Sequence, residues 1–205
     1  MKPLRIALTK GRLEKDTVKL LEAAGYDCSQ VIDKGRRLIL PVGDDIEVVL
    51  AKAADVITYV ENGVCDLGVV GKDTILEHGQ SFYEILDLGF GRCKFAVAGK
   101  KDGCEVSQIK TVASKYPNIT RRYFEGRGMD VRVVKIEGSV ELAPLLDLAD
   151  AIVDIVETGS TLRENGLEVK ADVCPISARL ICNIASLKLR KREIEELADK
   201  MSAQL

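Results

Sequence analysis

The chain has 205 residues, of which 46% are hydrophobic and 30% are charged, and its formal net charge is −2. This balance is typical of a folded globular protein, because disordered chains combine low hydrophobicity with a large net charge. The near-neutral charge gives no reason to expect general binding to nucleic acid or to a membrane. Since His78 is the single histidine, a multi-histidine metal centre is excluded, and a Ser/His or Cys/His mechanism would have to use that residue.

Cysteine spacing and the amino-terminal segment indicate the cellular compartment. The six cysteines, at positions 28, 65, 93, 104, 174 and 182, contain no CxxC pair, which argues against a zinc site. The first apolar segment is broken by Lys10 and Arg12, so it matches neither a signal peptide nor a membrane span. We therefore expect a cytoplasmic protein whose cysteines behave as small apolar side chains.

The first half of the chain alternates short apolar runs with helical patterns, which is typical of an α/β fold. An antiparallel hairpin interrupts this alternation around the turn at 42–45. In chain order, the pattern predicts a strand at 4–8, a helix at 13–24, hairpin strands at 37–41 and 46–51, a helix at 54–62, a strand at 66–71 and a helix from residue 72.

The second half continues the same alternation and suggests two lobes. In chain order, we expect a strand at 95–98, helices at 107–117 and 120–128, a strand at 131–136, a helix at 138–148 shortened or bent by Pro144, and strands at 151–156 and 178–183 before an amphipathic helix at 188–201. Apolar segments near 90–99 and 177–184 can cross between lobes. We therefore predict lobe I from 1–90 with 177–205, lobe II from 91–176, and a ligand cleft between them.

The strongest local signal follows the expected strand at 151–156. There an apolar run ends in acidic, hydroxyl and glycine residues, namely Asp154, Glu157, Thr158, Gly159, Ser160 and Thr161. Backbone N–H groups and hydroxyls at a helix start can surround a phosphate, and the two acids can accept hydrogen bonds from sugar hydroxyls or hold Mg²⁺-bound water. The pattern is equally compatible with an ordinary capped turn that carries exposed acids.

Cations gather at two other places in the first lobe. Lys10, Gly11 and Arg12 form a strand-to-helix loop that favours a polyphosphate, although surface Lys/Arg pairs are common. Arg36 and Arg37 precede an expected strand, whose pleat would send them to opposite faces unless the pair lies in the loop. For two further residues, the sequence favours a structural role. Glu141 is expected in the first turn of a helix, and His78 at a helix end.

Read together, these stretches resemble the ATP phosphoribosyltransferase family. The resemblance covers essentially the whole chain, and the shared order of its motifs is more specific than any one of them. The motifs lie at 7–13, 55–63, 66–73, 89–93, 115–120, 138–144, 149–154 and 157–162. The resemblance implies a two-lobed fold like that of type II periplasmic binding proteins.

The resemblance also implies an activity and residue roles. The activity is transfer of the 5-phosphoribosyl group of phosphoribosyl pyrophosphate to N1 of ATP, with Mg²⁺ held alongside the pyrophosphate and no direct metal ligand from the chain. Residues 157–161 would hold the 5-phosphate, with Asp154 and Glu157 toward the ribose. Arg36 and Arg37 would be catalytic. ATP and its polyphosphate would contact Lys10, Gly11, Arg12, Asp66, Asp73 and Glu141, while Lys52 stands where relatives often have arginine.

Chain length adds an expectation about regulation. The chain resembles the short form of the family, which associates with a separate regulatory subunit similar to histidyl-tRNA synthetase. We therefore expect a homodimeric core within a hetero-octamer. Two other functions stay open: a solute-binding module, because this architecture also serves uptake and sensing, and a phosphoribosyltransferase that uses another base. The purine-salvage type would show adjacent acids before its Thr-Gly loop, whereas here Asp154 and Glu157 are separated.

Overall fold

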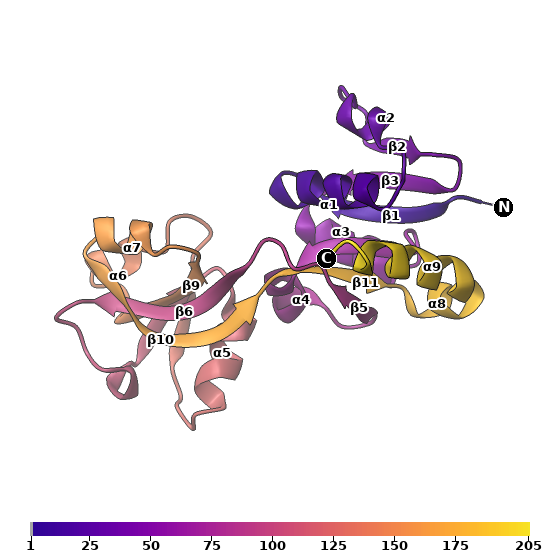
Figure 1. Cartoon of the computed structure of the whole chain (residues 1–205). Coiled ribbons are helices and arrows are strands. Elements are labelled where there is room, and N and C mark those ends of the chain that lie inside the picture. The colour runs from indigo at the N-terminus through magenta and orange to yellow at the C-terminus, as the bar shows by residue number, and fades with distance from the viewer. Residues whose placement is uncertain (1) are drawn as a thin grey trace. The chain divides into compact units, whose positions relative to one another are not determined.

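The computed structural model describes residues 2–205 and contains two compact units, which the chain connects twice (Figure 1). Unit 1 consists of Met1–Gly91 and Ser177–Leu205, and unit 2 consists of Arg92–Ile176. Each unit has helices packed on a sheet of its own, which confirms the expected α/β class. Among the described residues, no helix combines the length and the apolar character that a membrane span needs.

Unit 1 is built on a six-stranded mixed sheet in the order β2-β3-β1-β4-β11-β5. β1 pairs in parallel with β3 and β4, β2 is antiparallel to β3, and β11 is antiparallel to β4 and β5. The strands are β1 (Leu4–Thr9), β2 (Ile39–Val42), β3 (Ile46–Ala51), β4 (Leu67–Gly71), β5 (Tyr83–Asp87) and β11 (Ala178–Cys182). The carboxyl ends of β1, β3 and β4 therefore meet the start of β2 at one edge, here called the carboxyl edge.

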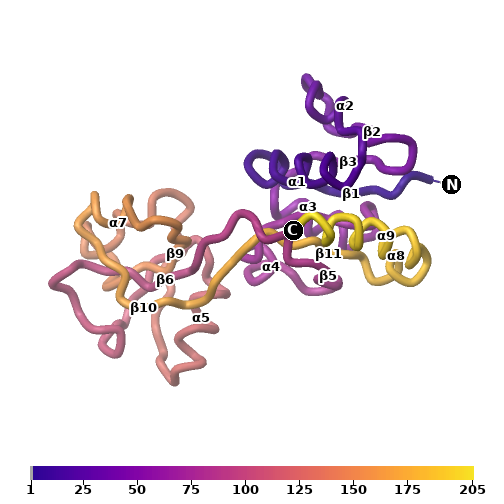
Figure 2. The backbone as a smooth tube through the Cα atoms, viewed as in Figure 1, coloured from indigo at the N-terminus to yellow at the C-terminus, as the bar shows by residue number. Residues whose placement is uncertain are grey.

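Helices cover both faces of this sheet because β1 alternates its apolar side chains. Ile6 and Leu8 are buried with residues of α1 and α9, whereas Ala7 is buried with residues of α3. The amino-terminal and carboxy-terminal segments thus build one core (Figure 2). The helices are α1 (Arg12–Ala23), α2 (Ser29–Ile32), α3 (Ala53–Glu61), α4 (Lys72–His78), α8 (Ile184–Leu189) and α9 (Lys191–Ser202).

Gly68 on β4 allows α3 to approach the sheet closely. A Cβ atom at this position would lie 2.8 Å from both Val56 Cγ1 and Val60 Cγ2. A larger side chain would therefore push α3 away from the sheet. The glycine in the Asp66-Leu67-Gly68 stretch is thus a packing requirement of unit 1.

Unit 2 is built on a five-stranded sheet in the order β10-β6-β9-β7-β8. β6 is antiparallel to β10 and β9, whereas β7 is parallel to β8 and β9. The carboxyl ends of β7, β8 and β9 consequently share an edge with the start of β6. The elements are β6 (Cys93–Lys100), the 3-10 helix η1 (Val106–Gln108), β7 (Thr111–Ser114), α5 (Pro117–Glu125), β8 (Arg132–Lys135), α6 (Leu142–Leu145), β9 (Ala151–Val156), α7 (Ser160–Glu164) and β10 (Leu167–Ile176).

The expected helix at 107–117 is wrong, because this segment contains β7. Val112 and Ala113 are fully buried and pair with Ala151 and Ile152 of β9. The buried Ser114 hydroxyl donates to the carbonyl of Val153 at 2.6 Å, which fixes the end of the strand. A short apolar run fits a buried strand and a buried helix equally well, so periodicity could not separate them.

Two other predicted elements are shorter than expected, and two strands were missed. β2 begins at Ile39 instead of residue 37, so both arginines before it lie in the loop. The expected helix at 138–148 is reduced to α6, where Pro144 has no N–H to donate and Asp147 takes a positive φ of 56°. β5 and β10 lie in segments to which the sequence pattern assigned no strand.

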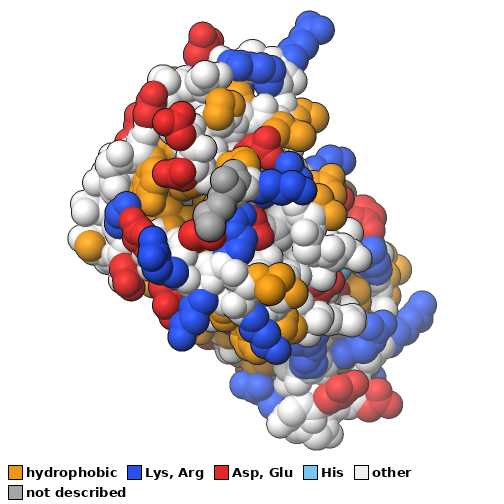
Figure 3. All heavy atoms as spheres, turned by 90° about the vertical axis from the view of Figure 1, so that its right-hand side faces the viewer, with side chains coloured by type: hydrophobic (Ala, Val, Ile, Leu, Met, Phe, Trp, Pro, Cys, Tyr) orange, Lys and Arg blue, Asp and Glu red, His pale blue; other side chains and the backbone are white. Residues whose placement is uncertain are grey.

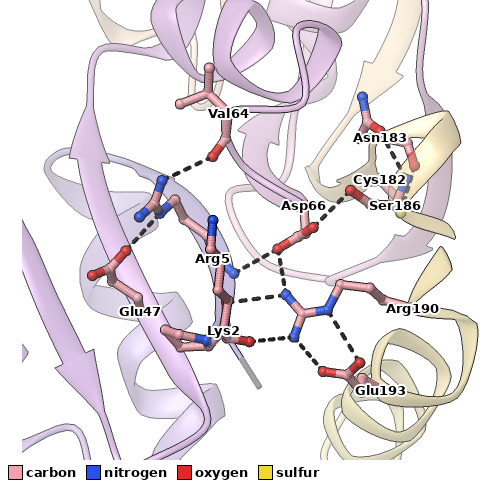
Figure 4. Close-up of polar contacts among 11 residues, drawn as sticks. Lys2, Arg5, Glu47, Val64, Asp66, Cys182, Asn183, Ser186, Arg190 and Glu193 are labelled. Carbon is pink, nitrogen blue, oxygen red and sulfur yellow. Dashed lines mark hydrogen bonds and ion pairs between the residues drawn. The ribbon is translucent and has the colours of Figure 1, made fainter.

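An ion-pair network anchors the carboxy-terminal helices at the edge opposite the carboxyl edge (Figure 4). Asp66, just before β4, accepts hydrogen bonds from the Arg5 N–H and from Arg190 Nη1, both at 3.0 Å, and from the Ser186 hydroxyl at 2.7 Å. Arg190, between α8 and α9, also pairs with Glu193 and donates to the carbonyls of residues 2 and 3. One carboxylate thereby connects β1, β4 and α8.

The expected amphipathic helix at 188–201 is divided in two at Arg190. α9 buries Ile194, Leu197 and Met201 in the core of unit 1, while its charged side chains stay exposed. On the face of the molecule that carries the two last helices, positive and negative side chains are interspersed (Figure 3). This mixture is typical of a solvated surface.

We predict that Asp66→Ala lowers the free energy of unfolding by about 2–4 kcal/mol, because it removes one acceptor of the partly buried Arg190 guanidinium together with the acceptors of the Arg5 N–H and the Ser186 hydroxyl. Urea denaturation of the purified chain measures the loss. Asp199→Ala, at an exposed position on α9, is the matched control and should change stability by less than about 0.5 kcal/mol. Equal stability of the two variants would contradict the anchoring role.

Candidate functional site

Two loops distant in sequence meet at the carboxyl edge of unit 1. The loop after β1 is fixed by a hydrogen bond from Lys10 N–H to the Ala51 carbonyl at 2.9 Å, and the loop before β2 by one from Leu50 N–H to the Leu38 carbonyl at 2.8 Å. Both loops are therefore tied to the end of β3. They enclose a shallow pocket of about 490 Å³, here called the cationic pocket, which is lined by Lys10, Gly11, Glu14, Lys15, Lys34, Gly35, Arg36, Arg37, Leu38 and Leu50.

The two arginines of the second loop have different surroundings. Arg37 donates from Nη1 to Gln30 Oε1 at 3.1 Å, from Nη2 to the Asp33 carbonyl at 2.8 Å and from Nε to the Lys34 carbonyl at 3.2 Å. Arg36 is exposed and makes no hydrogen bond or ion pair within residues 2–205. Arg37 therefore shapes the loop, whereas the guanidinium of Arg36 is available to an anion.

The structure brings only part of the expected polyphosphate group together. Arg12, the first residue of α1, does not line the cationic pocket, and its Nε lies 4.0 Å from Asp16 Oδ2. Asp66 lies at the opposite edge of the sheet, where Arg190, Arg5 and Ser186 occupy its oxygens. Lys52 is exposed at the start of α3, beside the end of β3.

Asp73 lies at the carboxyl edge, in the first turn of α4. A Cβ atom at residue 71 would lie 2.0 Å from Asp73 Oδ1, so the carboxylate folds back over the glycine that ends β4. Burial raises the pKa of Asp73 above its ordinary value, and the N–H of Thr74 opposes this increase. The Asp73 carboxylate therefore occupies the space that a side chain at residue 71 would need.

A second pocket lies at the matching edge of unit 2, and it unites residues that the sequence placed in two motifs. Its volume is about 320 Å³, and we call it the hydroxyl pocket. It is lined by Cys93, Glu141, Asp154, Ile155, Val156, Glu157, Thr158, Gly159, Ser160, Thr161 and Leu162. Glu141, at the start of α6, therefore lines the same pocket as the loop at 157–161.

The loop at 157–161 turns at a glycine in the left-handed conformation. Gly159 has a φ of 70°, which a residue with a side chain rarely adopts, and a Cβ atom there would lie 3.2 Å from Arg163 Nη1. The hydroxyls of Thr158 and Ser160 lie 3.1 Å apart, and Arg163 donates to the Thr158 carbonyl at 3.0 Å. The exposed Thr158, Ser160 and Thr161 thus present hydroxyls beside the first N–H groups of α7.

Asp154 and Glu141 form an electrostatically unfavourable pair in the hydroxyl pocket. Burial raises the pKa of Asp154 above its ordinary value, and the negative charge of Glu141 raises it further. The N–H of Ile155 and the positive charge of Lys115 act in the opposite direction. Carboxylates whose pKa is raised by burial and by a neighbouring negative charge are characteristic of functional sites.

Sequence reasoning missed Glu14, Lys34 and Cys93, which line the two pockets. The sequence pattern singled out no charge on the first helix, and the contact of Glu14 with Lys34 depends on the fold of the 33–38 segment. A glutamate three residues after the helix-start glycine was the available signal, because a side chain at that position can reach back to the N-cap N–H. Nothing in the spacing of the cysteines distinguishes Cys93 from the rest.

Comparisons with known proteins agree over nearly the whole chain. Residues 52–203 match a family model described as ATP phosphoribosyltransferase. ATP phosphoribosyltransferase of Clostridium kluyveri is 59% identical over 98% of this chain and 94% of its own length. The enzyme of Listeria monocytogenes is 55% identical, over 98% of this chain and 95% of its own length.

Solved structures support the same assignment. A chain of the ATP phosphoribosyl transferase (HisG:HisZ) complex from Thermotoga maritima matches with a TM-score of 0.82 and 33% identity, over 98% of this chain and 96% of that one. The periplasmic aliphatic sulphonate binding protein SsuA from Escherichia coli matches with a TM-score of 0.62 and 12% identity, over 99% of this chain and 72% of that one. The second likeness concerns the fold alone and confirms its type II periplasmic-binding-protein character. From the family model and these relatives together, we conclude that the chain belongs to the ATP phosphoribosyltransferase family.

Proposed function

We propose that the hydroxyl pocket binds the phosphoribosyl group of phosphoribosyl pyrophosphate and that the cationic pocket binds the polyphosphate of ATP and the leaving pyrophosphate. As a member of its family, the chain transfers the 5-phosphoribosyl group to N1 of ATP in the first step of histidine biosynthesis. The observation that carries the proposal is the contrasting chemistry of the two pockets. The hydroxyl pocket contains hydroxyls and carboxylates, and the cationic pocket contains three lysines and two arginines.

In the hydroxyl pocket, the 5-phosphate would bind to the hydroxyls of Thr158, Ser160 and Thr161 and to N–H groups of the 157–161 loop. The left-handed Gly159 supports this role, because it leaves the backbone open to a close approach. Asp154 and Glu157 would accept hydrogen bonds from the ribose hydroxyls, since carboxylates beside the phosphate itself would repel it. Glu141 would face the ribose or the nucleotide from the other side of the pocket.

In the cationic pocket, Lys10 and Arg36 would bind phosphate oxygens, and Gly11, whose N–H donates to Glu14 Oε2, would line the site with its backbone. Arg36 would stabilise the charge that grows on the leaving pyrophosphate, and Arg37 would hold the loop that presents it. Asp73 and Arg12 keep secondary roles in nucleotide binding. We leave Asp66 out of the site, because its oxygens already accept hydrogen bonds at the opposite edge of the sheet.

Displacement at the anomeric carbon passes through a state with oxocarbenium character and needs no covalent nucleophile. The chain must orient the adenine nitrogen, hold the ribose and neutralise the departing pyrophosphate. Fixed cations and backbone amides supply these effects, which is consistent with a chain that has a single histidine. His78 is exposed in the last turn of α4 and has no part in this scheme.

The family is one that generally needs a divalent metal, and we propose that the metal here is Mg²⁺. No group of three or more His, Cys, Asp or Glu side chains within residues 2–205 is arranged to hold a metal ion. Mg²⁺ is often bound largely by substrate phosphates and water, so we propose that it is held alongside the pyrophosphate with no direct ligand from the chain. When bound, the ion would neutralise charge on the pyrophosphate.

We further propose a cytoplasmic homodimeric core that joins a regulatory subunit in a hetero-octamer. The support is the similarity to the chain from the HisG:HisZ complex of Thermotoga maritima. Because SsuA has a similar fold, a solute-binding module is the alternative function. Sequence identity of more than 50% to ATP phosphoribosyltransferases favours catalysis instead. A phosphoribosyltransferase for another base has no such support.

The direct test incubates the chain with ATP, phosphoribosyl pyrophosphate and Mg²⁺, with and without the regulatory subunit, and follows phosphoribosyl-ATP by its near-ultraviolet absorbance. We expect turnover, a higher rate with the partner, and inhibition by histidine only in the complex. Binding of both substrates without turnover, even with the partner present, would favour the solute-binding alternative. A chain that gains neither rate nor histidine response from the partner would contradict the proposed assembly.

Arg36→Ala is expected to lower kcat by about 10²–10³-fold, which is the usual effect of removing one donor to a developing charge. Arg37→Ala should lower kcat less, because its guanidinium contacts its own loop. Rates are to be measured under single-turnover conditions, so that chemistry limits the signal. Arg192→Ala, exposed on α9, is the control. Wild-type kcat in both Arg36→Ala and Arg37→Ala would refute the catalytic role of this loop.

Asp154→Asn is expected to stabilise the protein while it weakens phosphoribosyl pyrophosphate binding. Because the folded-state pKa of Asp154 is raised, the ionised carboxylate costs stability at neutral pH, and that cost disappears as the pH falls through the raised pKa toward the ordinary value. The variant should therefore raise Tm by about 2–4 °C at pH 7, with a smaller difference at pH 4.5. Asp130→Asn, exposed in unit 2, is the control; a lower Tm for Asp154→Asn at pH 7 would contradict the argument.

A further inference from the structure

A buried carboxylate connects the two loops of the cationic pocket. Glu14 lies in the first turn of α1 and is 5% exposed. Its Oε1 forms an ion pair with Lys34, and its Oε2 accepts a hydrogen bond from the Gly11 N–H at 3.3 Å. An ionised carboxylate is costly to bury without such partners. Glu14 therefore ties the loop after β1 to the segment before β2.

Lys34 carries this connection on to the arginines. Its side chain reaches Glu14, while its carbonyl accepts hydrogen bonds from the Arg37 N–H at 3.0 Å and from Arg37 Nε at 3.2 Å. Gly35, with a φ of 55°, turns the chain immediately after Lys34. Arg36 is thus held between two fixed residues, although its own guanidinium makes no hydrogen bond or ion pair with any described residue.

Charge gives Glu14 a second effect. Within the described lining of the cationic pocket it is the one carboxylate among the cations Lys10, Lys15, Lys34, Arg36 and Arg37. Cations gathered around one pocket repel one another until an anion binds. A fixed carboxylate beside Lys34 reduces this repulsion in the empty pocket. The loops are therefore already arranged when the polyphosphate arrives, and less ordering is required on binding.

We propose that Glu14, through its ion pair with Lys34, is a positioning residue that sets where Arg36 meets the leaving pyrophosphate. It touches no substrate itself and acts through Lys34 and the Gly11 N–H. The inference rests on the proposed function, in which Arg36 stabilises charge in the cationic pocket. It adds that the contribution of Arg36 depends on an acid buried in a neighbouring helix.

The test is a double-mutant cycle on single-turnover phosphoribosyl-ATP formation. Glu14→Gln, which keeps the shape of the side chain, is expected to lower the rate roughly tenfold. The loss of rate caused by Arg36→Ala should be at least about tenfold smaller in the Glu14→Gln background than in the wild type, because a mispositioned arginine contributes less to the rate. Glu22→Gln, exposed on the same helix, should leave the rate and the cycle unchanged.

The possible failures are distinguishable. A wild-type rate for Arg36→Ala alone would overturn the proposed function and the inference with it. If Arg36→Ala has its expected effect, two results would overturn the inference alone. One is a Glu14→Gln rate within twofold of wild type, and the other is a double variant whose loss equals the product of the two single losses. In that case Glu14 would only cap α1.

Lys34 provides a second route, which does not depend on the folding of Glu14→Gln. Its side chain is 36% exposed, so substitutions there disturb the core little. Lys34→Gln should reproduce the loss seen with Glu14→Gln, and Lys34→Arg, which keeps the ion pair, should recover at least a third of the wild-type rate. Equal rates for Lys34→Gln and Lys34→Arg, with unchanged Tm values, would refute the role of the pair.

Discussion

The parallel pairing of β1 with β3 and β4 is the constraint on which unit 1 depends. Parallel strands bring their carboxyl ends to a common edge, so the loop at Lys10 and the start of α4 cannot lie apart. The antiparallel β2 then delivers the loop with Arg36 to the same place, because its first residue pairs near the end of β3. The cationic pocket is therefore a product of strand direction as much as of residue choice.

The two pockets solve opposite electrostatic problems. Around Arg36, five cations must be kept together without an anion, and one buried carboxylate helps to hold them. Around Asp154, carboxylates must be kept together without a cation, and burial makes their repulsion stronger. Under the proposed function, each pocket would be relieved by its own ligand group: an anionic phosphate at the cations, and a cation or a hydroxylated sugar at the carboxylates.

Sequence reasoning reached the motifs more securely than the contacts. The α/β class and the position of the acid-and-hydroxyl loop at 157–161 follow from local composition, because an apolar run that ends in glycine and hydroxyl residues indicates a strand followed by a turn. Local pattern could not show that Asp66 faces Arg190, since that contact joins segments 124 residues apart. It could not separate Arg36 from Arg37 either, because the partners of Arg37 depend on the turn after α2. The strand β7 was missed because a four-residue strand with three consecutive buried residues shows no readable period.

The network of Asp66 and Arg190 lies at the opposite end of the strands from the cationic pocket, a distance of about 20 Å for a six-residue strand. Substitutions in the loops of the cationic pocket are therefore expected to leave the anchor of the last two helices intact, and substitutions at the anchor to leave the loops in place. This separation allows substitutions at the carboxyl edge without loss of the stability that the Asp66 and Arg190 network contributes at the opposite edge. In this fold, the length of the strands therefore separates positions where substitutions change function from positions where they change stability.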